Sequence, residues 1–396
     1  MNSGNDTGQS PDRNSIHRAA VRLRKWAIEQ ALPLWANAGF DRKSGRFEER
    51  LSLSGQPVFD VQQRLMVQAR QIYSYGLAAR RGWHARAATL LAESYASMIR
   101  DYQRSDGRDG WVFSVHRDGS VADSRRDLYA HAFVLLAVAS YIMATGRREA
   151  LAVADEILDF LDQHMAAPLA GGYIDAFPAV DALRRQNPHM HMLEGLLSLW
   201  TSSGEERYLA RAKNIFELFA RHFFLPGYGV LAEYFDPGLN PAEGVKGRIV
   251  EPGHHYEWIW LLRWLETAGG CTVQAYVDAL YRHADAYGYD AQGLVVDELL
   301  SDGTIHTRSR RAWTVTEAIK ANLVEAARGR PGAAGKAASM VDRLHDYFLT
   351  KHPPGGWIDR LDEDGRPATD FMPASTLYHI LCALDELDRF DAECRS

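Results

Sequence analysis

One short pattern recurs six times along the chain and restricts the folds that the chain can adopt. Each copy has a glycine, a pair of aromatic or aliphatic residues, an alternation with acidic or polar residues, and usually a closing turn. The copies read "GRFEERLSLSG", "GWVFSVHRDGS", "GGYIDAFPAVD", "GVLAEYFDPG", "GLVVDELLSDG" and "GGWIDRLDEDG". They are marked by Gly45, Gly110, Gly172, Gly229, Gly293 and Gly356, at intervals of 65, 62, 57, 64 and 63 residues. This period exceeds that of the common solenoid repeats, so each unit must hold two helices.

The segments between these glycines have the spacing of helices. Apolar residues of "ALAVADEILDFLDQHM" recur at i, i+3 and i+4, and "DLYAHAFVLLAVASYIMATG" and "HMLEGLLSLWTSSG" end in glycines suited to a helix C-cap. The glycine copies themselves alternate with period two and close on Asp-Gly or Pro-Gly turns, which predicts short β-hairpins between the helices.

These patterns predict an all-α fold, an (α/α)6 barrel, in which six helical hairpins form a ring and short β-hairpins lie in the connecting loops. An open solenoid of six helical hairpins would satisfy the same pattern, since neighbouring hairpins bury each other's apolar faces in both architectures. We favour the closed ring because its inner lining is rich in polar and aromatic residues, whereas a solenoid core would be mostly aliphatic.

Composition excludes several classes of protein. The formal charge of −6 is spread along the chain without a basic stripe, which argues against nucleic acid or an anionic membrane as a partner. No window approaches 18 uninterrupted apolar residues, so we expect no membrane span. The three cysteines are too few and too scattered for a disulfide framework or a cysteine-based zinc site, which favours a reducing cytoplasm.

The N-terminus, "MNSGNDTGQSPDRNS", is polar and has no apolar core of the kind that a signal peptide needs. We therefore predict a disordered lead-in over residues 1–14 and a single catalytic barrel over residues 15–396.

Ionisable and aromatic residues gather at several predicted helix starts. They occur in "QQRLMVQARQIYSY", "DLYAHAF", "NPHMHMLEG" and "EPGHHYEWIW", and "MPASTLYHILCAL" places a histidine in an otherwise apolar helix. Helices that start after Pro188, Pro252 and Pro373 would turn these polar residues toward the barrel mouth. A pocket is expected there.

Two adjacent histidines raise the question of a metal site. His254 and Glu257 are three residues apart and share one helical face with Trp260, whereas His255 points about 100° away. A zinc or iron site would need a second matched pair, such as His-Glu-x-x-His, and the chain has none. His189 and His191 diverge on a helix, so we predict acid/base chemistry without a metal.

A structural explanation competes with the functional one for several residues. His131 alone would usually be a core histidine with satisfied hydrogen bonds, and Arg64 would suit a surface arginine with a buried stem. Trp258, Trp260 and Trp313 could fill the core. The functional interpretation rests on recurrence, since histidine or arginine appears at a similar position in several units.

Seven stretches in order resemble the N-acylglucosamine 2-epimerase superfamily, and especially its D-mannose isomerase branch, from about Trp35 to Leu387. They are "LWANAGFDRKSGRFEERL", "RLMVQARQIYSY", "DLYAHAF", "NPHMHMLEG", "GHHYEWIWLL", "RRAWTVTEAIKA" and "PASTLYHI". The resemblance implies an (α/α)6 barrel that acts on sugars and needs no organic cofactor. The chain also has no phosphate loop or dinucleotide fingerprint.

The resemblance also implies roles for individual residues. The acid/base pair falls on His254 and His379. The residues implied to bind substrate are Arg64, His191, Glu257, Trp260, Trp313 and Glu317, together with His131, which belongs to the recurrent set.

The chemistry of such an enzyme begins with ring opening and removal of the C2 proton to form a cis-enediolate. A histidine suits this step because its ordinary pKa of about 6.5 lets it act as base and then as acid. We predict His379 as the base, His254 as its partner for ring opening or proton return, and Arg64 as the charge facing the oxyanion. Glu257 would orient His254 or hold a hydroxyl.

Return of the proton to C1 gives a ketose, and return to the opposite face of C2 gives an epimer. We predict interconversion of D-mannose and D-fructose by a monomer or homodimer. The alternative is a 2-epimerase of the mannose/glucose, cellobiose or N-acylglucosamine type. A phosphorylated sugar would need extra cations, which Arg184 and Arg185 or Arg310 and Arg311 would supply. A binding barrel without turnover and a glycoside hydrolase rank lower, because hydrolysis needs two carboxylates and the motifs supply only Glu257.

Overall fold

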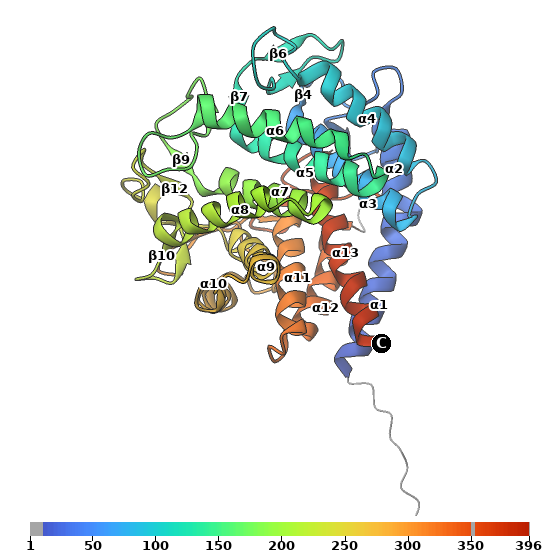
Figure 1. Ribbon diagram of the computed structural model, residues 1–396. Helices are drawn as coiled ribbons and strands as arrows, with labels where there is room; N and C mark the ends of the chain where they lie inside the picture. The colour runs from blue at the N-terminus through green and yellow to red at the C-terminus, as the bar shows by residue number, and fades with distance from the viewer. Residues whose placement is uncertain (1–10, 350–352, 396) are drawn as a thin grey trace, which may run out of the picture.

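Helices in two concentric layers make up most of the protein (Figure 1). The computed structural model describes residues 11–349 and 353–395. Within those ranges the inner layer consists of α3 (Leu65–Arg81), α5 (Leu128–Thr145), α7 (Gln186–Ser203), α9 (Pro252–Gly269), α11 (Ala312–Ala327) and α13 (Thr376–Arg395). The outer layer consists of α1 (Pro11–Trp26) with α2 (Leu32–Asn37), α4 (Ala87–Tyr102), α6 (Leu151–Phe160), α8 (Glu206–Leu218), α10 (Gln274–Tyr287) and α12 (Ala333–Arg343). Inner and outer helices alternate along the chain, as the repeat predicts.

Several outer helices contain or continue into a π-helical turn. These turns are η1 (Ala27–Ala31), η3 (Leu161–Met165), η4 (Phe219–Phe223) and η6 (Leu344–Leu349). Two 3-10 turns, η2 (Arg148–Ala150) and η5 (Lys246–Arg248), lie in the loops. Helix α1 begins at Pro11, within the stretch 1–14 that was predicted as a lead-in. Residues 1–10 lie outside the described part of the chain.

The ring of inner helices is closed. Each inner helix contacts the next, and α13 contacts α3, which is first in the ring. Helix α1 lies against α12 and α13 and so covers the junction from outside, where the two ends of the chain run side by side (Figure 1). The predicted barrel is therefore confirmed, and the open solenoid is excluded.

Short antiparallel strands join neighbouring units all the way around the barrel. The pairs that link one unit to the next are β4 (Gln63–Arg64) with β5 (Ser114–Val115), β7 (Arg126–Asp127) with β8 (Ala176–Phe177), β9 (Arg184–Arg185) with β12 (Tyr234–Phe235), β13 (Ile249–Val250) with β14 (Glu298–Leu300), β16 (Arg310–Arg311) with β17 (Arg360–Leu361), and β18 (Phe371–Pro373) with β3 (Arg50–Ser52). The last pair ties the sixth unit to the first.

The expected hairpins within single units also form. They are β1 (Phe40–Asp41) with β2 (Arg46–Phe47), β5 with β6 (Val121–Asp123), β10 (Phe224–Leu225) with β11 (Val230–Leu231), and β14 with β15 (Ile305–Thr307). The recurrent glycine enters these loops with a left-handed backbone, at φ of 75° for Gly45 and 74° for Gly293. A side chain is strained in that conformation. In the sixth unit Gly355, not Gly356, has the positive φ, of 85°.

One backbone hydrogen bond sets the same register in most inner helices. The first amide of the helix, or for α13 the amide of Ala374 two residues before the helix, donates to a carbonyl in the loop of the next unit: Leu65 to Phe113, Leu128 to Asp175, Gln186 to Glu233, Ala312 to Asp359 and Ala374 to Glu49, over 2.9 to 3.3 Å. The fourth inner helix begins at Pro252, which has no N–H to donate. Counting from these six starting residues places equivalent side chains of the six helices in layers across the barrel.

Helix α5 is long and apolar enough to cross a membrane by length and composition alone. Most of its residues are buried inside the protein, where it packs between α3 and α7. A helix buried in a protein core can be as long and as apolar as a membrane span. The composition of α5 therefore follows from its place in the inner layer.

Candidate active site

One layer of the barrel interior carries chemically active side chains from nearly every inner helix. The layer lies five residues after each starting residue and contains Arg70, Phe133, His191, Glu257, Glu317 and His379. All six side chains are buried. Carboxylate oxygens of Glu257 and Glu317 and a ring nitrogen of His379 lie within 4.8 Å of one another. Four residues that the sequence pointed to, all but Arg70 and Phe133, are therefore brought together.

His379 is held by a carboxylate that has its own counter-ion. Its Nδ1 lies 2.8 Å from Oε1 of Glu317, and Nζ of Lys320 lies 2.6 Å from Oε2 of the same carboxylate. Because an ionised carboxylate only accepts hydrogen bonds, Nδ1–H donates and Nε2 keeps its lone pair. Burial, aided by the charges of Arg70 and Lys320, lowers the pKa of His379 well below its usual range. His379 is therefore neutral and able to take a proton.

His254 has a similar hydrogen bond but the opposite charge. Its Nδ1 lies 3.0 Å from Oε1 of Glu233 and 3.8 Å from Oε2 of Glu251. Burial alone would lower the pKa of His254, but these two carboxylates outweigh it and raise the pKa to about 9. The ring centroid of Trp313 lies 5.0 Å from that of His254 and 5.7 Å from that of His379. One indole thus contacts both a protonated and a neutral histidine.

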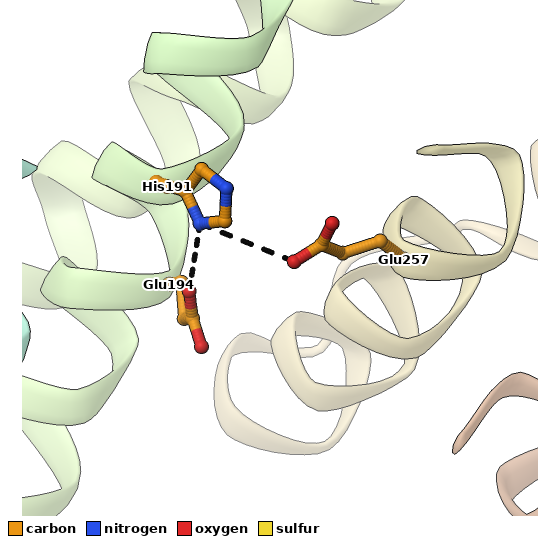
Figure 2. Close-up of side chains that lie close together, drawn as sticks. All are labelled: His191, Glu194 and Glu257. Carbon is orange, nitrogen blue, oxygen red and sulfur yellow. Dashed lines mark hydrogen bonds and ion pairs between the residues drawn. The ribbon is translucent and has the colours of Figure 1, made fainter. Parts of the chain in front are cut away.

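His191 and Glu257 face each other from α7 and α9 (Figure 2). Nδ1 of His191 lies 2.9 Å from Oε2 of Glu194 and 4.0 Å from Oε1 of Glu257. Burial lowers the pKa of His191 to about 4, so the ring is neutral and its Nδ1–H donates to Glu194. Tyr378 donates its hydroxyl to Oε1 of Glu194. Glu194 therefore ties α7 to the helix that carries His379.

Glu257 has a buried carboxyl oxygen without a hydrogen-bond partner in the described part of the chain. Its buried Oε1 makes no hydrogen bond within the described residues. Burial, with the nearby charges of Glu317 and Glu194, raises the pKa of Glu257 well above its usual range. A protonated carboxyl group both donates and accepts, so Glu257 can bind a sugar hydroxyl or carbonyl oxygen.

The arginine in this layer is Arg70, six residues after the one that the sequence pointed to. Arg70 is buried, donates to the hydroxyl of Tyr129 at 2.6 Å and lies 4.2 Å over the ring of Phe133. Its Nε has no partner among the described residues. Arg64 lies at the barrel rim, with its side chain 39% exposed and Nε 2.6 Å from Glu49. The structure therefore favours Arg70 over Arg64 as the cation that faces substrate.

Trp260 lies one layer deeper than the histidines. Its indole N–H donates to Glu386 at 3.0 Å, and Nζ of Lys320 lies 3.8 Å from its ring centroid. It also lines a cavity of about 650 Å³ near the C-terminal ends of the inner helices, together with Trp264 and Cys382. We expected an aromatic wall beside the substrate, and the structure instead places Trp260 in the floor of the site.

Both ring nitrogens of His131 are used inside the protein, which argues against the substrate-binding role expected for it. Nδ1 donates to the carbonyl of Asp127 at 2.7 Å, and Nε2 accepts from the amide of Trp111 at 3.3 Å. Burial lowers the pKa of His131 to about 4, so it is neutral. The His131 side chain thus links the loop that contains Trp111 to the start of α5.

His189 and His255 accept loop amides in the same way, from Tyr173 and from Leu231, both at 3.1 Å. These two residues and His131 each lie three residues after a helix start. The recurrence of histidine that we took as a functional signal is in these units a structural one.

The rim arginines of the sequence motifs have carboxylate or backbone partners. Arg184 donates to the carbonyls of Gly171 and Tyr173, and Arg310 to those of Arg308 and Glu363. Arg185 pairs with Asp175 and Asp181, and Arg311 with Asp297 and Glu251.

Three groups of histidine and carboxylate side chains are close enough to surround a small cation. They are His191 with Glu194 and Glu257, His254 with Glu233 and Glu251, and His379 with Glu257 and Glu317. In each group the histidine Nδ1 already has a carboxylate acceptor, and Lys320, Arg70 and Arg311 supply positive charge. The prediction that no metal or cofactor takes part stays a prediction.

Sequence reasoning missed Arg70, Glu194, Glu233 and Lys320. Arg70, in "QARQIYSY", was available by register, because it stands at the same distance from its helix start as His191 and His379. Glu233 occupies an acidic position of the glycine repeat that Glu49 and Asp297 share. Glu194 and Lys320 could have been found by spacing, because each is a polar residue three positions after another inward residue, His191 or Glu317.

Comparison with known proteins agrees with the resemblance seen in the sequence. The model of the family N-acylglucosamine 2-epimerase (GlcNAc 2-epimerase) matches residues 45–383. The mannose-6-phosphate isomerase of Rhizobium meliloti (strain 1021) is 35% identical over 94% of this chain and 97% of that relative. The D-mannose isomerase of Thermobifida fusca is 30% identical over 69% of this chain and 72% of that relative.

A solved structure, that of cellobiose 2-epimerase from Spirochaeta thermophila DSM 6192, has the same fold at a TM-score of 0.84 and 22% identity, covering 98% of this chain and 100% of that chain. These comparisons confirm both the superfamily and the likeness to its D-mannose isomerase branch. The chain belongs to the N-acylglucosamine 2-epimerase family and is an enzyme of the isomerase class.

Proposed function

We propose that the protein interconverts D-mannose and D-fructose by proton transfer between C2 and C1. The observation that carries the proposal is the pair of histidines in contact with Trp313, of which His379 is neutral and His254 is protonated. A base and an acid of this kind are what an aldose–ketose isomerisation needs at neutral pH. The relatedness to a D-mannose isomerase supports the choice of sugar.

The first steps place each residue in a role. His254 donates a proton to the ring oxygen as the sugar opens and takes back the proton that the anomeric hydroxyl loses in becoming the C1 carbonyl. Nε2 of His379 then removes the proton from C2 of the open aldose. The electron pair of the C2–H bond forms the C1–C2 double bond, and the carbonyl oxygen becomes an oxyanion. Arg70, which has an unpartnered Nε, and the protonated Glu257 donate to that oxygen. Each such donor contributes roughly 3 kcal/mol to the transition state.

The second half decides the product. His379 returns its proton to C1, and the proton of the C2 hydroxyl passes to the oxyanion on C1, so that the C2 carbonyl of fructose forms. A 2-epimerase would instead return a proton to the opposite face of C2, which requires a second acid there. His254 is the candidate for that acid, so a 2-epimerase remains the alternative on the same site.

A phosphorylated substrate is a second candidate, because the relative at 35% identity is named mannose-6-phosphate isomerase. One rim feature favours it. Arg50 stacks on Phe371 at 4.4 Å and makes no ion pair within the described residues, and it lies near Arg64 through their shared neighbour Glu49. Two guanidinium groups on one side of the mouth suit a phosphate.

One experiment separates these reactions. The protein is incubated in deuterated water with D-mannose, D-mannose 6-phosphate, D-glucose, cellobiose or N-acetylglucosamine, and the products are followed by NMR. We expect fructose labelled at C1 from mannose, and faster turnover of the 6-phosphate if Arg50 and Arg64 hold a phosphate. An epimer labelled at C2 would replace the isomerase by a 2-epimerase, and no product from any of the five sugars would refute the proposal. The cytoplasmic location and the monomeric or dimeric state stay predictions.

A further inference from the structure

Lys320 is a lysine in the barrel interior that the proposed mechanism does not use. It stands on α11 one turn after Glu317, and its side chain has no exposed surface. The layer in which it lies also holds Tyr73, Leu136, Glu194, Trp260 and Cys382, eight residues after each helix start. A fully buried lysine is rare, and removing its charge from water is costly unless neighbouring groups compensate.

The compensation comes from groups that belong to the active site. Nζ of Lys320 lies 2.6 Å from Oε2 of Glu317 and 3.8 Å from the ring centroid of Trp260. Burial alone would lower the pKa of Lys320, but the neighbouring acidic groups, among them the carboxylates of Glu317 and Glu194, raise it. The ammonium group is therefore permanently charged beneath the layer that carries the two histidines.

We propose that Lys320 is a positioning residue for His379, which it controls through Glu317. By binding Oε2, Lys320 keeps Glu317 ionised and leaves Oε1 as an acceptor for Nδ1–H of His379. Nε2 of His379 then faces the substrate without a proton. The proposal rests on the proposed function only in naming His379 as the base.

The reverse case shows why the lysine is needed. Burial raises the pKa of Glu317, and Lys320 is the first of the charges that counter this rise. Without Lys320, Glu317 takes a proton and donates it to Nδ1, so His379 carries its proton on Nε2 and loses its basic nitrogen. The other charged or titratable groups near His379 or Glu317 remain: Arg70 from α3, His191 and Glu194 from α7, and His254 and Glu257 from α9. None of these has a hydrogen bond to Glu317.

The test uses Lys320→Met and Glu317→Gln singly and together. We expect Lys320→Met to lower kcat by about tenfold or more with KM within about twofold, since it disables the base and leaves the binding groups in place. In Glu317→Gln the amide oxygen turns to Lys320 and the amide NH2 to His379, so kcat falls as well.

In the double variant the amide is free to turn its oxygen to His379. Lys320→Met should therefore raise kcat by about threefold or more in the Glu317→Gln background, although it lowers kcat in the natural one. A role for Lys320 in folding alone predicts a loss in both backgrounds, and that outcome would overturn the proposal. The double variant also buries no unpaired charge, so it serves if Lys320→Met does not fold. Lys336→Met, at a half-exposed lysine of α12, is the matched control and should leave kcat unchanged.

A second measurement needs no sugar. Nitrogen-15 NMR of the His379 ring should show the Nδ1–H tautomer in the natural protein and the Nε2–H tautomer in Lys320→Met. An unchanged tautomer would refute the role of Lys320, whatever the substrate is. Conversely, full activity of His379→Asn would refute the proposed function and leave the tautomer result standing, so the two failures are distinguishable.

Discussion

His254 and His379 make the same kind of contact and end with opposite charges. Each contacts Trp313 and donates Nδ1–H to a buried carboxylate, over 3.0 Å and 2.8 Å. The difference lies in what holds the carboxylate. Glu317 is neutralised by Lys320, whereas Glu233 has no lysine or arginine partner among the described residues. The presence or absence of a cationic partner on the carboxylate thus decides which histidine is the acid and which is the base.

The barrel rim explains why Glu233 is different. Among the described residues, three other units pair the acidic residue of the loop with an arginine just before the inner helix: Glu49 with Arg64, Asp175 with Arg185 and Asp297 with Arg311. Before α9 that position holds Glu251, a second acid. The charge of Glu233 therefore acts on His254, while Glu251 is held by Arg311 at 2.8 Å.

The largest effect is expected from removing the base. His379→Asn should lower kcat by about 10³-fold with a small change in KM, because the group that takes the C2 proton is lost while the binding groups stay. Steady-state kinetics with the preferred sugar measures this. His306→Asn, at an exposed histidine in β15, is the control. A loss below tenfold would show that another group removes the proton.

Arg70→Met and Arg64→Met separate the two arginines. We expect Arg70→Met to lower kcat/KM by about 10²-fold, because a donor aimed at the oxyanion is worth roughly 3 kcal/mol. Arg64→Met should change kcat/KM for D-mannose by less than about threefold, because Arg64 is a partly exposed rim residue paired with Glu49. Equal losses of kcat/KM in the two variants would show that Arg64 also binds the substrate.

The charge on His254 can be removed through its partner. Since the carboxylates raise the pKa of His254 to about 9, the acid is present at neutral pH and is lost as pH rises through 9. Glu233→Gln removes the largest of the raising causes, so the alkaline limb of kcat should move toward 6.5 and the rate at pH 8 should fall by about tenfold. Glu243→Gln, at an exposed acid in the same loop region, should leave the limb in place. If the alkaline limb of kcat did not move in Glu233→Gln, that limb would report the titration of a group other than His254.

The smallest effect on catalysis is expected for a structural histidine. His131→Leu leaves the amide of Trp111 without its acceptor, so unfolding free energy should fall by about 1–3 kcal/mol while kcat of the folded protein is unchanged. Denaturant titration and kinetics on the same sample measure both. A fall in kcat with unchanged stability would restore His131 to the substrate-binding set.

Sequence reasoning found much of the active layer. His191, Glu257, Glu317 and His379 were identified, and they lie in one layer because each is five residues after its helix start. Arg64 was identified from the resemblance and Arg70 was missed, although both stand in the same motif. The burial of Arg70 and the rim ion pair of Arg64 with Glu49 distinguish them. Trp260 was expected beside the substrate, although three residues along a helix is nearly a full turn and places it one layer deeper.

By itself the sequence determined the sixfold repeat, the alternation of helices and loops, the family, and most of the residues that face the barrel interior. These follow from local periodicity, which repeats every 3.6 residues and every unit. Only the tertiary structure decided which histidine is charged. Charge depends on burial and on partners from other helices, such as Glu317 for His379, 62 residues away, and Glu194 for Tyr378, 184 residues away. No local sequence pattern encodes contacts between residues so far apart. Only the tertiary structure therefore distinguishes the acid from the base.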